Sequence, residues 1–77
     1  MEEVLKADGF DEAIIGQTWD ISTSATRIIY SADKCIDILI ANNNWEDDEA
    51  IEYFEFNVSG AYVGPNTPIF LEEYTEE

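Results

Sequence analysis

The first half of the chain alternates between apolar and polar positions in the way that β-strands do. Residues 13–21 are rich in β-branched and aromatic side chains, which favours a strand. One face of that strand would carry Ala13, Ile15, Gln17, Trp19 and Ile21. Gly16 in its middle indicates a β-bulge or the close approach of another element. Residues 26–30 predict a second strand, and the Ser22-Thr23-Ser24 turn between the two predicts an antiparallel hairpin.

The middle of the chain changes to the spacing of helices. From residue 32 to about residue 42 apolar side chains recur at helical intervals, and Ser31 or Asp33 would cap the start of this helix. A second helix is predicted from Asn44, as its N-cap, through Val58, with Gly60 as its stop. The buried side of the second helix would consist of Ala50, Ile51, Phe54 and Val58, broadened by Tyr53 and Phe56, with Trp45 packed at its entrance. Because so short a link joins the two helices, they should form a tight pair.

The remaining segments complete a single small domain, residues 1–77. Residues 69–71 predict a third strand, with Pro68 at a position that suits a sheet edge. Residues 1–7 predict a short helix that must dock on the rest of the chain, and residues 72–77 are expected to be frayed. This order of elements predicts an α+β fold, a small three-stranded antiparallel sheet with the helical pair packed on one face.

Composition supports a folded chain and bounds its stability. Hydrophobic residues make up 45% of the 77 residues, which is too apolar for a disordered acidic segment. A domain of this size buries a modest core, so its free energy of unfolding should be a few kcal/mol. The single cysteine, Cys35, excludes an internal disulfide, and no apolar run matches a signal peptide or a membrane span. We therefore expect a cytoplasmic protein.

Charge is the unusual property of this sequence. Eighteen Asp and Glu residues against three Lys and Arg residues give a net charge of −15. Such a field repels nucleic acid and membranes with anionic lipids, and it attracts basic partners. The sequence leaves two interpretations open: the acidity is a solubility or saline-environment adaptation, or a basic surface is the partner.

The residues argue against catalysis and against bound cofactors. The chain has no histidine, which removes the commonest general base and every zinc site that uses imidazole. Cys35 lies in an apolar stripe, as a core cysteine does, and its neighbour Lys34 points in a different direction. The glycines lack the spacing of a phosphate-binding loop, and the acids around Asp47 lack the glycine-centred loop that binds calcium. We predict no enzyme, no cofactor and no catalytic or metal-binding residue.

Four acids of the second predicted helix are the candidate partner-binding residues: Asp47, Asp48, Glu52 and Glu55. The last three recur at helical spacing on the face opposite the buried stripe. Like charges three or four residues apart weaken a helix by a few tenths of a kcal/mol per pair, and no lysine relieves them. Carboxylates regularly spaced on a rigid element resemble the phosphate track of DNA, which carries about one charge per 1.7 Å of duplex. A merely solvated helix face explains the same pattern.

Four stretches carry a resemblance to a known group of proteins. They are residues 8–16 (DGFDEAIIG), 34–39 (KCIDIL), 52–64 (EYFEFNVSGAYVG) and 67–70 (TPIF). Together they resemble a family of short uncharacterised acidic proteins from tailed bacteriophages and related bacterial genomes. That family has no assigned activity, so the resemblance implies a context, a phage-type gene product in the cytoplasm of a host bacterium, and no functional site.

Two hypotheses from different classes follow. The first is a non-enzymatic interaction protein whose acidic face, with acids of the termini, binds a basic surface on a bacterial protein. Inhibition of a nucleic-acid-binding enzyme by DNA mimicry is its concrete form. The alternative is a structural or assembly protein that uses exposed aromatic residues and a sheet edge for a homo-oligomer or virion contact. Binding that weakens steeply with salt distinguishes the first from the second.

Overall fold

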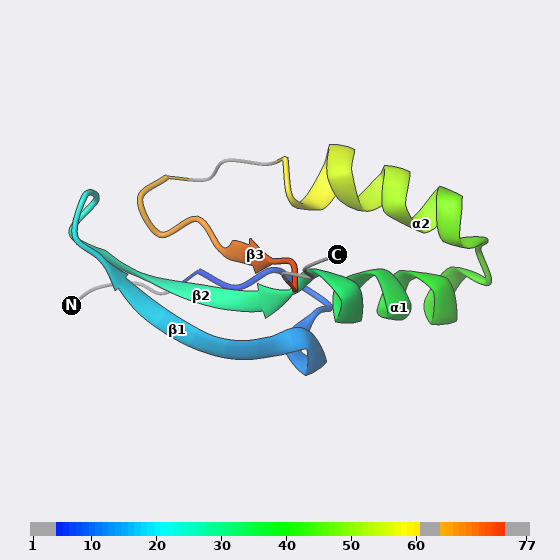
Figure 1. Ribbon diagram of the computed structural model, residues 1–77, viewed down its shortest axis with the longest axis horizontal. Coiled ribbons are helices and arrows are strands. Elements are labelled where there is room, and N and C mark those ends of the chain that lie inside the picture. Colours follow the sequence, from blue (N-terminus) through cyan, green and yellow to red (C-terminus); the bar gives the residue numbers. More distant parts are fainter. Residues whose placement is uncertain (1–4, 61–63, 74–77) are drawn as a thin grey trace.

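The computed structural model describes residues 5–60 and 64–73 and shows a small α+β fold (Figure 1). Its elements in chain order are the 3-10 helix η1 (Asp11–Ala13), strands β1 (Ile14–Asp20) and β2 (Ala25–Ser31), helices α1 (Ala32–Asn43) and α2 (Asp47–Tyr53), the π-helical turn η2 (Phe54–Val58) and strand β3 (Ile69–Leu71). The α+β class and the two helices that the sequence predicts are confirmed.

The three strands form a mixed sheet in the order β1-β2-β3. β1 and β2 make the predicted antiparallel hairpin, and the register shifts between Ile14 and Gly16, so the irregularity lies directly before that glycine. β3, in contrast, runs parallel to β2, so the prediction of an antiparallel sheet is wrong.

The path of the chain explains the parallel strand. α2 carries the chain back alongside α1, and the turn that precedes β3 reverses its direction again (Figure 1). Two reversals restore the direction of β2. The turn is held to β2 by side-chain bonds, in which Arg27 Nε donates to the Thr67 carbonyl at 2.7 Å and Asn66 Nδ2 donates to the Thr26 carbonyl at 2.9 Å.

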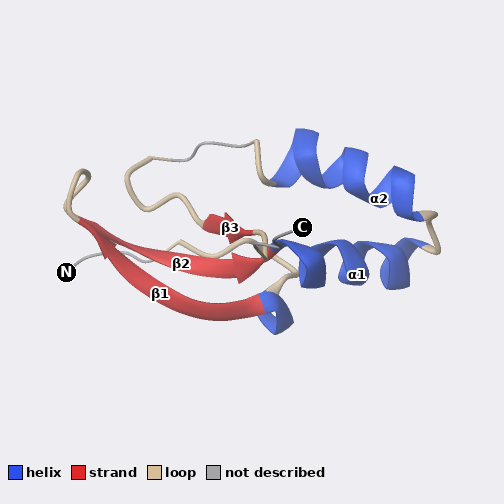
Figure 2. Ribbon diagram, viewed as in Figure 1, coloured by secondary structure: helices blue, strands red, loops and turns tan. Residues whose placement is uncertain are grey.

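The helical pair lies beyond the ends of β2 and β3 (Figure 2). The sequence predicted instead that the pair packs on one face of the sheet. The cause is local: β2 ends at Ser31 and α1 begins at Ala32, so the chain continues from strand to helix without a turn. As a result, the sheet faces stay largely uncovered near β1. Every residue of that strand from Ile15 to Trp19 is exposed.

The core fills the junction between the sheet and the helices. Its buried residues are Phe10, Ala13, Ile28, Tyr30, Ala32, Cys35, Leu39, Ala50 and Phe54. The Tyr30 and Phe70 rings stack with centroids 5.3 Å apart, and Phe54 meets Phe70 edge-on at the same separation. Cys35 is fully buried, which confirms its prediction as a core residue.

The ends of the chain are described in part. The Ala7 N–H donates to the Tyr30 hydroxyl at 2.7 Å, which fixes the N-terminal segment to β2. Residues 5–7 are not helical, so the predicted helix is absent there, and residues 1–4 lie outside the described residues. Glu72 and Glu73 are exposed without regular structure, and the rest of the predicted frayed end, residues 74–77, is likewise not described. Among the described residues no helix has the length and apolar character that crossing a bilayer requires.

Candidate functional site

The start of α2 is built differently from the prediction. Asn44 adopts the left-handed conformation, with φ of 55°, and ends α1, as its side chain allows. Because it is committed to that role, the N-cap of α2 is Glu46, two residues later, and the prediction of Asn44 as the N-cap is wrong. The Glu46 N–H donates to the Glu49 carboxylate at 3.2 Å, so a side-chain carboxylate accepts a backbone N–H at the start of the helix. At the start of α1 the predicted cap Ser31 is confirmed, since its hydroxyl accepts from the Lys34 N–H at 3.3 Å.

The end of α2 widens into the π-helical turn η2. The Ser59 N–H donates to the Phe54 carbonyl at 2.8 Å, five residues back, which marks the wider turn. Over α2 and η2 only Ala50 and Phe54 are fully buried, with Val58 half-buried. Three apolar side chains predicted for the buried side are exposed instead, Ile51 at 40%, Tyr53 at 42% and Phe56 at 78%. The buried stripe is therefore narrower than predicted.

The four predicted partner-binding residues all lie on the surface. Asp47, Asp48, Glu52 and Glu55 are exposed, and within residues 5–60 and 64–73 none of them forms an ion pair. Helical spacing places the last three on the side away from Ala50, while Asp47 sits in the first turn, where the helix dipole favours an acid. In the described part of the chain no group of three acid or cysteine side chains is arranged to hold a metal ion.

An acid-rimmed hollow of about 420 Å³ lies on one flank of α2. Four carboxylates from three parts of the fold line it: Asp33, Glu55, Glu72 and Glu73. Its apolar lining comes from Ile36, Ile51, Phe54 and Phe70. Glu55 is one of the four predicted partner-binding residues, and Glu72 and Glu73 are terminal acids of the kind that the first hypothesis joined to the acidic face. Asp33, in the first turn of α1, was not predicted.

A second, smaller hollow of about 260 Å³ lies on the other flank and is largely aromatic. Trp45, Tyr53 and Phe56 line it together with Glu49 and Glu52. The Trp45 and Tyr53 rings pack with centroids 5.2 Å apart, so Trp45, which precedes α2, contacts the last residue of that helix. Sequence reasoning missed the aromatic half of this surface because it assigned Tyr53 and Phe56 to the core. Their position outside the strict stripe of Ala50 and Phe54 was the available signal.

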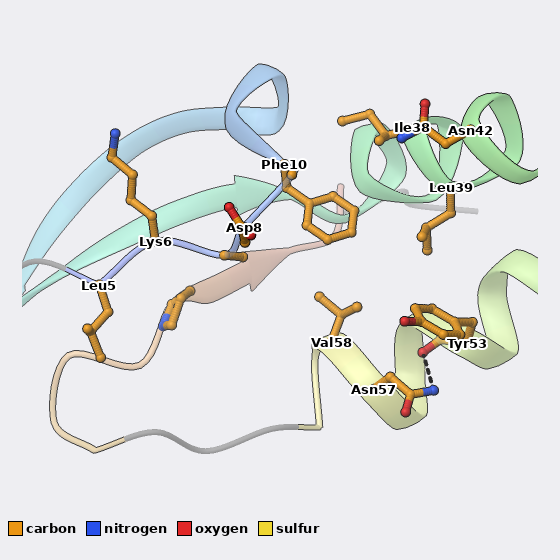
Figure 3. Close-up of a pocket in the computed structure, with 13 residues that line it drawn as sticks. Leu5, Lys6, Asp8, Phe10, Ile38, Leu39, Asn42, Tyr53, Asn57 and Val58 are labelled. Atoms are coloured by element: carbon orange, nitrogen blue, oxygen red, sulfur yellow. Dashed lines mark hydrogen bonds between the residues drawn. The ribbon is translucent and has the colours of Figure 1, made fainter.

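A cleft of about 600 Å³ lies between the N-terminal segment and the two helices. Figure 3 shows Phe10, Leu39 and Val58 around this space, and Lys6 extending away from the helices. The Asn57 amide donates to the Tyr53 carbonyl at 3.3 Å, so it is committed to the helix. Lys6 and Asp8 are the charged residues of the described lining. The cleft offers apolar contact and no acid–base pair.

The groups with perturbed pKa values belong to β1, β2 and α1. Hydrogen bonds from Ser22 and Arg27 hold the pKa of the Asp20 carboxyl at about 2. Burial raises the pKa of the Cys35 thiol to about 11, and burial also raises the pKa of the Tyr30 phenol. Each shift has a structural cause, and a thiol that stays protonated is a poor nucleophile. These groups therefore support the fold.

Comparisons of the chain with protein-family models, with curated proteins and with solved structures return no match. The resemblance of residues 8–16 and 52–64 to short tailed-phage proteins therefore stays a prediction.

Proposed function

We propose that this protein is a non-enzymatic interaction module that binds a basic surface on a bacterial protein. The binding surface is the acidic α2 surface, which we define as Asp47, Asp48, Glu49, Glu52, Glu55, Tyr53 and Phe56. The observation that carries the proposal is the composition of this surface. Exposed carboxylates and exposed aromatic rings occur together on α2 and η2, and residues 47–58 contain no basic residue.

The charges of this surface are only partly explained by the helix itself. Asp47, Asp48 and Glu49 lie in the first turn, where they interact favourably with the helix dipole. Glu52 and Glu55 lie beyond that turn and repel their neighbours at three- and four-residue spacing. Lysine or arginine side chains of a partner would remove this repulsion. The acids that destabilise the free helix would therefore strengthen the binding of a basic partner.

The aromatic rings give the surface contact area as well as charge. Aromatic side chains are enriched in the buried centres of protein interfaces, and their rings also attract lysine and arginine through cation–π contacts. Phe56, 78% exposed, and Tyr53 lie next to Glu52 in the smaller hollow. The combination favours a protein with a basic surface over a simple cation.

Mimicry of nucleic acid is the concrete form of this function. A DNA-binding enzyme presents lysine and arginine along a groove that follows the phosphate backbone. The acidic α2 surface offers carboxylates along a rigid helix that could occupy such a groove. In the phage context that the sequence resemblance implies, the result is inhibition of a host enzyme.

The test is capture from bacterial lysate on the tagged protein, with elution through a salt gradient and identification by mass spectrometry. One variant combines Asp48→Asn, Glu52→Gln and Glu55→Gln. A matched control combines Asp11→Asn, Glu12→Gln and Asp37→Asn, which removes the same number of exposed carboxylates away from α2. The proposal predicts a nucleic-acid-binding protein that elutes at moderate salt, is lost with the α2 variant and is kept by the control.

Two results contradict the proposal. If both variants lose the captured protein equally, net charge alone attracts it, and the acidic α2 surface has no special role. If the α2 variant captures as well as the wild type, these carboxylates are only solvated.

A further inference from the structure

β1 is an open edge of the sheet. The strand order β1-β2-β3 leaves one side of β1 without a neighbouring strand, and in Figure 1 it forms the lower border of the described fold. With seven residues it is as long as the central strand β2. Alternate N–H and C=O groups of an edge strand point outward and offer hydrogen bonds to another strand.

The central part of β1 lacks the usual protection of an edge strand. Natural edges are blocked by lysine, by proline, by bulges or by very short strands. Residues 14–19 contain neither proline nor any charged residue. The bulge lies at the start of β1, and residues 16–20 pair with β2 in regular register. This regular stretch is long enough to pair with a further strand.

Exposed apolar side chains accompany the open backbone edge. Ile15 is 47% exposed, Trp19 is 57% exposed, and Ile21 in the following turn is 85% exposed. Trp19 lies opposite Thr26 of β2, on the same face of the sheet as Ile28 and Tyr30. Ile28 and Tyr30 are buried on that face, whereas Trp19 is exposed.

The hairpin is electrically neutral in a strongly acidic chain. Residues 13–32 contain two charged side chains, Asp20 and Arg27, and these form an ion pair of 2.9 Å. The net charge of −15 therefore comes from the rest of the chain. Two copies of this protein repel one another at most approaches, and the hairpin is where that repulsion is weakest.

We infer that β1 pairs antiparallel with β1 of a second copy of this chain, about a two-fold axis near Gln17 and Thr18. Two identical antiparallel edges complement one another, because each outward N–H of one copy meets an outward C=O of the other. The uncharged edge gives a basic partner no electrostatic reason to bind there, whereas it suits a copy of itself. The pairing continues the sheet across both chains and covers the Trp19 side chains.

This dimer is independent of the proposed function and has the opposite response to salt. Salt screens the repulsion between two acidic chains, so it should strengthen the dimer. Salt should weaken the binding of a basic partner to the acidic α2 surface. The failure of one proposal therefore leaves the other open to its own test.

The first experiment is sedimentation velocity over a range of protein and salt concentrations. The wild type should shift from one chain to two as either concentration rises. Gln17→Lys should remain monomeric, because the two-fold axis places its lysine close to that of the other copy. Glu52→Gln is the control: it changes the net charge equally, lies on α2, and should dimerise as the wild type does. Unfolding midpoints in urea show whether each variant is folded.

The second experiment locates the contact by cysteine cross-linking. Gln17→Cys and Thr18→Cys place a thiol at the predicted axis, and Glu52→Cys places one on α2. Cys35 stays in every variant because it is fully buried. Under mild oxidation one of the β1 variants should form disulfide dimers far faster than the α2 variant. A wild type that stays monomeric at high protein and salt concentration, a dimer that Gln17→Lys leaves intact, or equal cross-linking from α2 would overturn the inference.

Discussion

At the residue scale, the ion pair between Asp20 and Arg27 has the clearest chemical role. Arg27 Nη1 donates to Asp20 Oδ2 at 2.9 Å, and its Nε donates to the Thr67 carbonyl. The Ser22 hydroxyl donates to the other Asp20 oxygen at 2.7 Å. One arginine thus connects the end of β1, strand β2 and the turn before β3. It also neutralises the only acid of the hairpin.

These bonds predict how stability changes in acid. Because the folded state holds the pKa of Asp20 at about 2, below the ordinary 3.8, the ionised carboxyl stabilises the fold. That contribution is present above about pH 4 and is lost as the pH falls toward 2. Asp20→Asn should therefore have a lower unfolding midpoint in urea than the wild type at pH 5. The difference between the two proteins should be smaller at pH 2. A difference between the two proteins that stays constant over this range would contradict the account.

Several residues could be assigned from the sequence because one local interaction decides each of them. Ser31 caps α1 through its own hydroxyl, Cys35 packs in the core, and Gly16 lies next to the register shift of β1. Glu46 as the N-cap of α2 could not be assigned in this way. Asparagine suits both the left-handed end of a helix and an N-cap, and the structure uses Asn44 to end α1.

At the scale of elements, the π-helical turn η2 changes the helical phase after Tyr53. Phe56, which was predicted to broaden the buried side, lies in this wider turn and is 78% exposed. The direction of β3 also depends on long-range packing, since nothing local to residues 69–71 distinguishes parallel from antiparallel pairing. Both errors arise where contacts between distant segments override local pattern.

Gly60 gives a test of the end of η2. A Cβ at Gly60 would lie 2.8 Å from the Glu55 carbonyl oxygen, which is too close for the backbone to remain in place. Gly60→Ala should lower the free energy of unfolding by about 1–3 kcal/mol, the usual cost of overpacking. Gly16→Ala is the control, because a Cβ there meets nothing within 4 Å and should cost little. Urea unfolding of both variants measures the difference. If the two variants are equally stable, η2 accommodates the added methyl group at Gly60 without a cost in stability.

At the scale of the whole molecule, the net charge of −15 should make stability depend on salt. Self-repulsion destabilises the compact state, and salt screens it within a Debye length of about 10 Å at 0.1 M. The thermal midpoint should therefore rise as sodium chloride is added from low to moderate concentration. The measurement is a circular dichroism melt at a protein concentration where sedimentation shows one chain. A midpoint that falls or stays constant would mean that self-repulsion is unimportant.

The candidate surface could be predicted in part from the sequence. The carboxylates Asp48, Glu52 and Glu55 follow from helical spacing, and all three are exposed on α2 and η2. The exposure of Tyr53 and Phe56 was not predicted, because both were assigned to the buried side. Asp33 of α1 and Glu72 and Glu73 after β3 line one hollow with Glu55 through the packing of distant segments. The charge of the surface was therefore predictable, and its shape was not.

The central claim is that the acidic α2 surface, rather than net charge, recognises a basic partner. The most direct measurement is a titration of isotope-labelled protein with a synthetic peptide rich in arginine and aromatic residues, followed by backbone amide shifts. The account predicts shifts concentrated at residues 47–56. These should shrink with added salt, vanish in the Asp48, Glu52 and Glu55 variant, and persist in the Asp11, Glu12 and Asp37 control. Shifts spread over all exposed acids, or an equal loss in both variants, would contradict it.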